Sequence, residues 1–262
     1  MNVLPDEDFV LREIMARTSR AASPTPQFSS LAGARQYRRL HRLVRRRVPA
    51  GAAVLDWGTG NGHFAYFLRF SGYRATGFTI EGNSQAAWLD EPYELFAAGD
   101  PCEPVKLPFT DASFDAVASI GVLEHVRETG GSETASLEEI ARVLRPGGVF
   151  VCFHLPNRWS WIDFLASRVP GKHHHDYRYG RDDVRSLVAG AGLDLVELQR
   201  YGLLPRNMLG RLPAPVAGSR RFADAWDALD AALGALLSPL CQNWAFVAVR
   251  RRDAGAVAAG GR

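Results

Sequence analysis

Cysteine is scarce in this chain of 262 residues, and its placement excludes two kinds of structure. The three cysteines, Cys102, Cys152 and Cys241, are far apart and form no C-x-x-C pair. This spacing argues against a disulfide framework and against a zinc site built on cysteine. It suits a reducing compartment, and we expect a cytoplasmic protein.

Long hydrophobic runs, a basic leader and a strong net charge are also missing. The amino terminus is acidic at residues 6–8 and does not resemble a signal peptide, and the longest apolar run, residues 231–240, is too short to span a bilayer. A net charge of +3 does not by itself indicate a polyanion-binding protein. With 47% hydrophobic and 23% charged residues, the chain fits one globular domain with a substantial core.

The stretch V-L-D-W-G-T-G-N-G-H-F, residues 54–64, is the most informative part of the chain. Apolar residues run into Asp56, glycines follow at every second position, and a helically spaced apolar run comes next, which predicts a strand, a turn and a helix. Glycine permits positive φ and has no Cβ, so a ligand can lie against the backbone at the start of the helix. A dinucleotide fingerprint would need glycine where His63 stands, and a carboxylate before the turn suits a cation better than a pyrophosphate.

This run resembles the first motif of the class I S-adenosylmethionine-dependent methyltransferases. In that family the acidic residue anchors the amino group of the methionine part, and the glycine loop passes beneath the cofactor. The resemblance implies S-adenosyl-L-methionine as the cofactor of this chain. It also implies a set of cofactor contacts in the turn: Asp56, Trp57, Gly58, Thr59, Gly60 and Gly62. The alternative is a glycine-rich turn that binds no ligand.

The resemblance implies a ribose contact at the end of the next strand, expected at 74–80. Glu81 is the candidate acceptor for the ribose hydroxyls, helped by Thr79, because alternate strand residues point to the same side. Glu81 could instead cap the helix that follows.

An adenine contact is implied after the third strand, expected at 94–98. The adenine amino group donates hydrogen bonds and therefore needs an acceptor. Asp100, followed by Pro101, is the candidate, and Glu103 is the alternative.

The segments L-P-F-T-D-A-S-F-D-A-V at 107–117 and V-L-E-H-V at 122–126 carry a second resemblance. They are similar to the L-P-F…S-F-D-x-V…L-E-H-V pattern of the small-molecule branch that includes ubiquinone and menaquinone biosynthesis methyltransferases. Gly121, which lies between the segments, is a further expected cofactor contact. Enzymes that methylate exocyclic amines of nucleobases typically carry Asn/Asp-Pro-Pro-Tyr/Phe here, and S-I-G-V at 119–122 does not match, so that class is disfavoured.

Three histidines are candidate catalytic bases. A hydroxyl acceptor must lose its proton, and a histidine that titrates near neutrality is the usual agent. His125 and His154 follow the fourth and fifth expected strands, and His175 could reach in from a loop. Each of them could instead be a hydrogen-bonded part of the pocket wall.

Three consecutive histidines at 173–175 raise the question of a metal. Adjacent residues rarely converge on one ion, and no matching histidine or carboxylate spacing lies nearby, so we expect no metal site. The stretch G-K-H-H-H-D at 171–176 is similar to the lid region of the quinone-pathway O-methyltransferases, and we expect a loop over the substrate pocket.

The family pattern implies an α/β fold: a Rossmann-like doubly wound seven-stranded sheet, order 3-2-1-4-5-7-6, with the last strand antiparallel. We expect an N-terminal helical cap at 1–50, a cofactor-binding domain at 51–252 and a disordered tail at 253–262. An insertion at 201–242 includes an apolar helix that could act as a substrate lid or rest on a membrane surface, although core packing is the more frequent outcome.

The expected function is methyl transfer from S-adenosylmethionine to a small-molecule acceptor, first of all a hydroxyl of a phenol, sugar or polyketide. We do not expect nucleic acid as a partner, but contact with a membrane or a lipid-linked substrate stays open. One alternative is an RNA or nucleic-acid methyltransferase or binder that uses the arginine-rich helix expected at 34–48, although a solvated helix packed on the sheet is more common. The other is an S-adenosylmethionine-binding protein without transferase activity.

Overall fold

The computed structural model describes residues 6–19, 25–60, 62–80 and 95–252. The expected ribose contact Glu81 and the expected tail at 253–262 lie outside these described residues.

The described strands form one seven-stranded sheet in the order β3-β2-β1-β4-β5-β7-β6. Neighbours from β3 to β5 pair in parallel, and β7 is antiparallel to both β5 and β6. The expected order and the antiparallel last strand are therefore confirmed. The strands are β1 (Ala53–Trp57), β2 (Arg74–Thr79), β3 (Leu95–Ala98), β4 (Phe114–Ile120), β5 (Leu144–Pro156), β6 (Leu193–Tyr201) and β7 (Asn243–Arg250).

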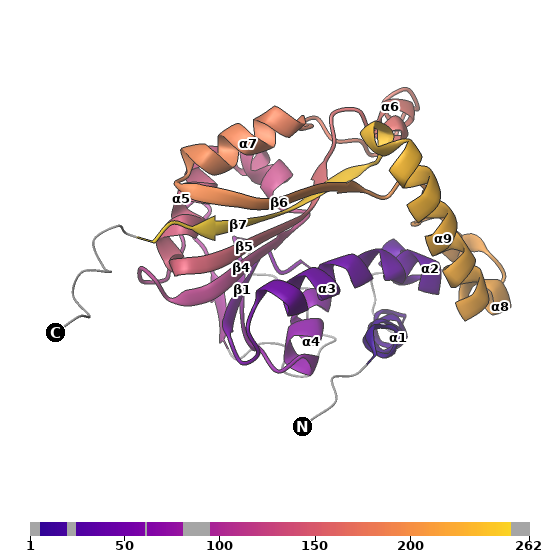
Figure 1. Cartoon of the computed structure of the whole chain (residues 1–262), viewed down its shortest axis with the longest axis horizontal. Coiled ribbons are helices and arrows are strands. Elements are labelled where there is room, and N and C mark those ends of the chain that lie inside the picture. Colours follow the sequence, from indigo (N-terminus) through magenta and orange to yellow (C-terminus); the bar gives the residue numbers. More distant parts are fainter. Residues whose placement is uncertain (1–5, 20–24, 61, 81–94, 253–262) are drawn as a thin grey trace.

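Helices cover both faces of the sheet, with α3 and α4 on one side and α5 and α7 on the other (Figure 1). Because a central parallel strand is buried on both faces, its sequence is apolar almost throughout. In β1, Val54 packs into the core beneath α3 and α4, and Leu55 packs into the core beneath α5 and α7. The helices before the fourth strand are α1 (Glu7–Thr18), η1 (Pro26–Phe28), α2 (Leu31–Ala34), η2 (Arg35–Tyr37), α3 (Arg38–Arg47) and α4 (His63–Phe70).

The helices after the fourth strand include the expected insertion. They are η4 (Leu123–Thr129), α5 (Glu133–Val143), α6 (Trp161–Ala166), α7 (Arg181–Gly190), η5 (Leu209–Arg211), α8 (Ala214–Ala217), α9 (Arg220–Leu236) and η6 (Ser238–Leu240). No helix of the described part of the chain is long and apolar enough to cross a membrane.

The insertion packs on the N-terminal helices. Leu31 and Ala32 of α2 form a small core with Leu209 and Ala223 from η5 and α9. Segments far apart in the sequence are therefore in contact here, and α2 and α9 lie next to each other (Figure 1).

Strand β5 is irregular near its end. His154 has φ 69°, and the pairing of β5 with β7 shifts between Phe153 and Leu155. A bulge of this kind redirects a side chain, and such features concentrate next to functional sites.

Candidate functional site

An open cavity of about 1850 Å³ lies at the carboxyl ends of the parallel strands. Its wall combines the end of β1, the turn after β4, the bulge of β5, the end of β6 and parts of α3, α6 and the insertion. Open α/β sheets bind their ligands at this edge, where successive strands leave a crevice.

The glycine turn after β1 forms one wall of this cavity. Gly58, Gly60 and Gly62 have φ values of 79°, 45° and 70°, which side-chain-bearing residues rarely adopt. The backbone N–H groups of Gly58 and Thr59 donate to the carbonyl of Phe78 at 2.9 and 3.1 Å, so the turn is tied to β2.

Gly58 also approaches its neighbour too closely for any other residue. A Cβ at this position would lie 2.4 Å from Cγ2 of Val122, which is in the turn after β4. The bare backbone beside Asp56 is thus required by packing as well as by φ. Asp56 is only 1% exposed, and it still lines the cavity.

The cavity wall holds buried polar atoms that no described residue satisfies. They are Oγ1 of Thr59, Nδ1 of His63 and Oε2 of Glu124. An unsatisfied buried polar atom costs about 1–3 kcal/mol. Together with Asp56 and the glycine turn, these atoms fit a ligand that carries amino, carboxylate and hydroxyl groups.

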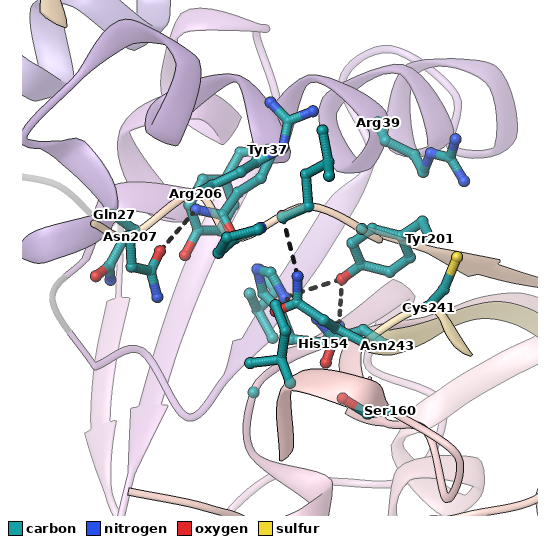
Figure 2. Close-up of a pocket in the computed structure, with 18 of the residues that line it drawn as sticks. Gln27, Tyr37, Arg39, His154, Ser160, Tyr201, Arg206, Asn207, Cys241 and Asn243 are labelled. Carbon is teal, nitrogen blue, oxygen red and sulfur yellow. Dashed lines mark hydrogen bonds between the residues drawn. The ribbon is translucent and has the colours of Figure 1, made fainter. Parts of the chain in front are cut away.

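His154 lies in the cavity wall with its Nδ1 atom occupied (Figure 2). The Tyr201 hydroxyl lies 2.9 Å from Nδ1 and also accepts the backbone N–H of His154 at 2.9 Å, while Asn243 Nδ2 approaches Nδ1 at 3.5 Å. Since these groups donate to Nδ1, the ring proton is on Nε2. Burial lowers the pKa of His154 to about 3. The ring is therefore neutral and better suited to donate a hydrogen bond than to take a proton.

His125 and His175 have the opposite arrangement. Nδ1 of His125 lies 2.7 Å from Oε1 of Glu128, and Nδ1 of His175 lies 3.1 Å from Oδ2 of Asp163. Because carboxylates accept hydrogen bonds, each Nδ1 carries a proton, and Nε2 is the ring nitrogen that faces no carboxylate in these contacts. Burial lowers the pKa of His175, but the hydrogen bond and charge of Asp163 outweigh it and the net pKa is raised.

Glu124 completes this side of the cavity. It is 4% exposed, and burial raises the pKa of its carboxyl to about 7. A Cβ on Gly121 would lie 3.7 Å from its Oε1 atom, so the carboxyl group is adjacent to the turn after β4.

Comparison with known proteins places this arrangement in a family. The model of a methyltransferase domain matches residues 55–152. A probable S-adenosylmethionine-dependent methyltransferase of Mycolicibacterium smegmatis is 30% identical over 202 residues, which are 72% of this chain and 74% of that protein. The chain belongs to the class I S-adenosylmethionine-dependent methyltransferases.

Other relatives match a smaller share of this chain. The 27-O-demethylrifamycin SV methyltransferase of Amycolatopsis mediterranei is 30% identical over 168 residues, 60% of this chain and 56% of that protein. Some relatives with shorter matches are named as tRNA methyltransferases. The chain spans about half the length of the first curated relatives that it matches.

A solved S-adenosylmethionine-dependent methyltransferase from Archaeoglobus fulgidus shares the fold. Its TM-score is 0.53 at 16% identity, and the match covers 94% of this chain and 100% of that structure. Membership of this family confirms the expected cofactor, S-adenosylmethionine, and the expected methyl transfer stays a prediction as to its acceptor.

The methyltransferase brings most of the predicted site residues together. Those that line the cavity are Asp56, Gly58, Thr59, Gly60, Gly121, His125, His154 and His175. In contrast, the Trp57 side chain packs into the core beneath α5 and α7, and Gly62 precedes the first turn of α4.

Three predicted cofactor contacts lie away from the lining of this cavity. Thr79 ends β2, and Asp100 and Pro101 follow the carboxyl end of β3. Oδ1 of Asp100 accepts the backbone N–H of Cys102 at 2.8 Å, so this side chain also shapes the turn that follows β3. Their contact with the adenosine part of the cofactor stays a prediction.

Sequence reasoning missed three residues that shape the site: Glu124, Asp163 and Tyr201. Glu124 stands beside His125 in the L-E-H-V motif, so the signal was present in the sequence. Asp163 and Tyr201 lie 12 and 47 positions from the histidines that they contact, and no spacing rule connects them.

Proposed function

We propose that this chain transfers the methyl group of S-adenosylmethionine to a hydroxyl of a small molecule such as a phenol, sugar or polyketide. The observation that carries the proposal is the proximity of the glycine turn to groups that can activate a hydroxyl. Asp56, His125 and His175 line one cavity, and a carboxylate at Nδ1 of each of these histidines leaves Nε2 as the atom that can exchange a proton with an acceptor. The relative named 27-O-demethylrifamycin SV methyltransferase supports oxygen as the acceptor atom.

The residues divide the work between holding the cofactor and preparing the acceptor. When bound, S-adenosylmethionine supplies a methyl group already activated by its positively charged sulfur. Asp56 holds the amino group of the methionine part, and Gly58 and Gly60 let the cofactor lie against bare backbone. Alignment of the two reactants contributes about 7–11 kcal/mol, and removal of the hydroxyl proton by a positioned histidine contributes about 10²–10⁴-fold.

The acceptor side of the cavity is closed by the insertion, which we propose as a lid held in place by polar contacts. Asp230 of α9 accepts the backbone N–H groups of Leu203 and Leu204 at 2.9 and 2.7 Å. Nε1 of Trp161 in α6 donates to the carbonyl of Leu203 at 2.8 Å. Since Tyr37 and Tyr201 line the same space, it suits an acceptor with an apolar or aromatic body.

The arginine-rich helix gives little support to a nucleic-acid acceptor. Its positive charges face carboxylates: Arg42 contacts Glu7 at 3.0 Å, and Arg46 and Arg47 contact Glu197 at 2.8 and 2.7 Å. Binding to nucleic acid is driven by arginines that neutralise phosphates and displace their counterions. An arginine already paired with a carboxylate neutralises a phosphate less effectively. The shorter matches to tRNA methyltransferases keep this alternative worth a direct test.

The proposal is tested by S-adenosylhomocysteine release with panels of phenolic, sugar and polyketide acceptors. We expect release only when an acceptor is present, and we expect His125→Ala to lower turnover by about 10²-fold or more. His174→Ala, a change in the same loop as His175, is the control and should not alter turnover.

Two other outcomes would contradict the proposal. Cofactor binding without turnover of any acceptor class would indicate a binding protein. Methylation of an RNA oligonucleotide, with affinity that falls steeply as salt increases, would indicate a nucleic-acid methyltransferase.

A further inference from the structure

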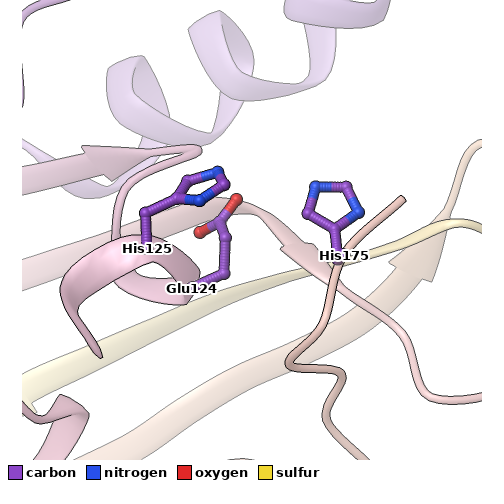
Figure 3. A group of neighbouring side chains, drawn as sticks. All are labelled: Glu124, His125 and His175. Carbon is purple, nitrogen blue, oxygen red and sulfur yellow. The ribbon is translucent and has the colours of Figure 1, made fainter. Parts of the chain in front are cut away.

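Glu124, His125 and His175 meet at one point of the cavity wall (Figure 3). Each offers one ligand atom, and these atoms all lie within 4.8 Å of one another. Glu124 and His125 come from η4, and His175 comes from the segment between α6 and α7, so the tertiary fold assembles the group.

Both imidazoles are held in the tautomer that a metal ion requires. Glu128 and Asp163 each accept a hydrogen bond from Nδ1, which leaves each Nε2 as a free donor of electrons. Histidine ligands of metals almost always carry such a partner on the second nitrogen, because it fixes the ring and raises its basicity.

The third member is a carboxyl group that the described residues leave incomplete. Glu124 is 4% exposed, and its Oε2 atom has no hydrogen-bond partner among them. A buried carboxylate is stabilised by pairing, by coordination of a metal ion or by protonation. This distinguishes the cluster from exposed acidic groups, which solvent satisfies.

We propose that Glu124, His125 and His175 bind a divalent transition-metal ion of the Zn²⁺ type and leave one or more coordination positions open to the cavity. Two imidazoles and one carboxylate form a ligand set used by zinc enzymes and by other first-row ions. Bond lengths of about 2.0–2.2 Å place ligand atoms roughly 3.3–3.6 Å apart, so the side chains would close by about 1 Å around the ion.

This proposal revises the sequence-based expectation of no metal site. That expectation concerned the run at 173–175, whose adjacent residues rarely converge on one ion. Only His175 of that run joins the cluster, and its partners come from a motif 50 positions earlier, which no local spacing reveals.

The role of the ion rests on the proposed function, whereas its binding does not. An ion at this position would bind the acceptor hydroxyl and lower its pKa, as zinc does for bound water. With the ion bound, the hydroxyl proton would pass to solvent, and His125 and His175 would act as ligands of the ion in place of the base role proposed above. The oxygen–methyl bond forms as the sulfur–methyl bond breaks, so no further reactant is needed.

The test is a titration of metal-stripped protein with Zn²⁺ against a chromophoric chelator. We expect one ion per chain with micromolar or tighter affinity. Glu124→Gln and His175→Ala should each weaken binding at least 10-fold, and Asp163→Asn, which removes the charge behind His175, should weaken it about 10–100-fold. His174→Ala, in the adjacent exposed position, should bind Zn²⁺ like the unaltered protein.

A second readout separates this proposal from the proposed function. Cofactor affinity, measured by calorimetry without metal, should be unchanged in His175→Ala, which shows that the variant is folded. Zn²⁺ affinity that is undetectable at micromolar concentration, or equal in Glu124→Gln, His175→Ala and the unaltered protein, would overturn the metal site whatever acceptor is found. One bound ion that requires both residues would support it even if no hydroxyl acceptor is methylated.

Discussion

The hydroxyl of Tyr201 bridges two atoms of His154, the backbone nitrogen and Nδ1, each at 2.9 Å. The contact joins the end of β6 to the bulge of β5 across β7, and it holds a residue whose φ of 69° is rare for a side chain with a Cβ. It fixes both the backbone and the ring of one histidine in the cavity wall.

Removal of this hydroxyl should lower stability. In Tyr201→Phe the buried N–H and Nδ1 of His154 lose their partner, and we expect a loss of about 1–3 kcal/mol in the free energy of unfolding. Tyr73→Phe is the control, since its hydroxyl makes one contact, to the carbonyl of Val48 at 3.2 Å. Urea unfolding measures both. Equal losses in the two variants would show that the bridge to His154 has no special weight.

Asp56 should determine cofactor affinity. Asp56→Ala removes the carboxylate expected to hold the amino group of S-adenosylmethionine, and we expect affinity to fall at least tenfold, or about 1.4 kcal/mol or more. Asp56→Asn keeps the size of the side chain and separates charge from packing. Isothermal titration calorimetry is the measurement, and unchanged affinity in Asp56→Ala would remove the assignment.

Gly58 should tolerate no side chain, for two separable reasons. Gly58→Ala introduces both a positive φ on alanine and a contact with Val122, and we expect a loss of about 1–3 kcal/mol together with weaker cofactor binding. Gly51→Ala has the strain alone, because Gly51 has φ 75° with nothing within 4 Å of a Cβ. Unfolding curves should therefore show the larger loss at Gly58, and adding Val122→Ala should recover part of it. Equal losses at both glycines would contradict the packing argument.

Stability should fall as the solution is acidified below pH 6.5. Burial lowers the pKa of His41 well below its usual value and that of His63 to about 4. An unfolded histidine titrates near pH 6.5, so between that pH and the lower pKa of the folded state the unfolded chain binds more protons. In this range the free energy of unfolding falls by about 1.4 kcal/mol per pH unit for each such histidine.

His41 offers a direct test of this pH dependence. Its ring stacks on Phe67 with centroids 3.9 Å apart, so phenylalanine is a matched replacement. The free energy of unfolding of His41→Phe, measured between pH 4.5 and 6.5, should decline less steeply by about 1.4 kcal/mol per pH unit. Parallel curves for the two proteins would show that His41 keeps an ordinary pKa.

The sequence by itself determined the fold and the cofactor. The glycine turn after β1 depends on local features, namely alternating glycines, an apolar run before them and helical spacing after them, and these are visible in eleven consecutive letters. The expected strand order came from the resemblance of this turn to the class I methyltransferases, because local spacing does not order the strands of a sheet. The bulge at His154, where the pairing of β5 with β7 shifts, had no signal in the sequence.

Only the tertiary structure decided how the histidines of the site can act. His125 and His175 are 50 positions apart in the sequence, and His154 and Tyr201 are 47 apart. Whether such side chains meet depends on the path of the loops and the angles at which helices pack on the sheet. The same holds for the arginines of α3, of which Arg42 pairs with Glu7 and Arg46 and Arg47 pair with Glu197, from distant parts of the chain. Residue type and spacing fix which groups are present, and three-dimensional packing fixes which proton, carboxylate or cation each one faces.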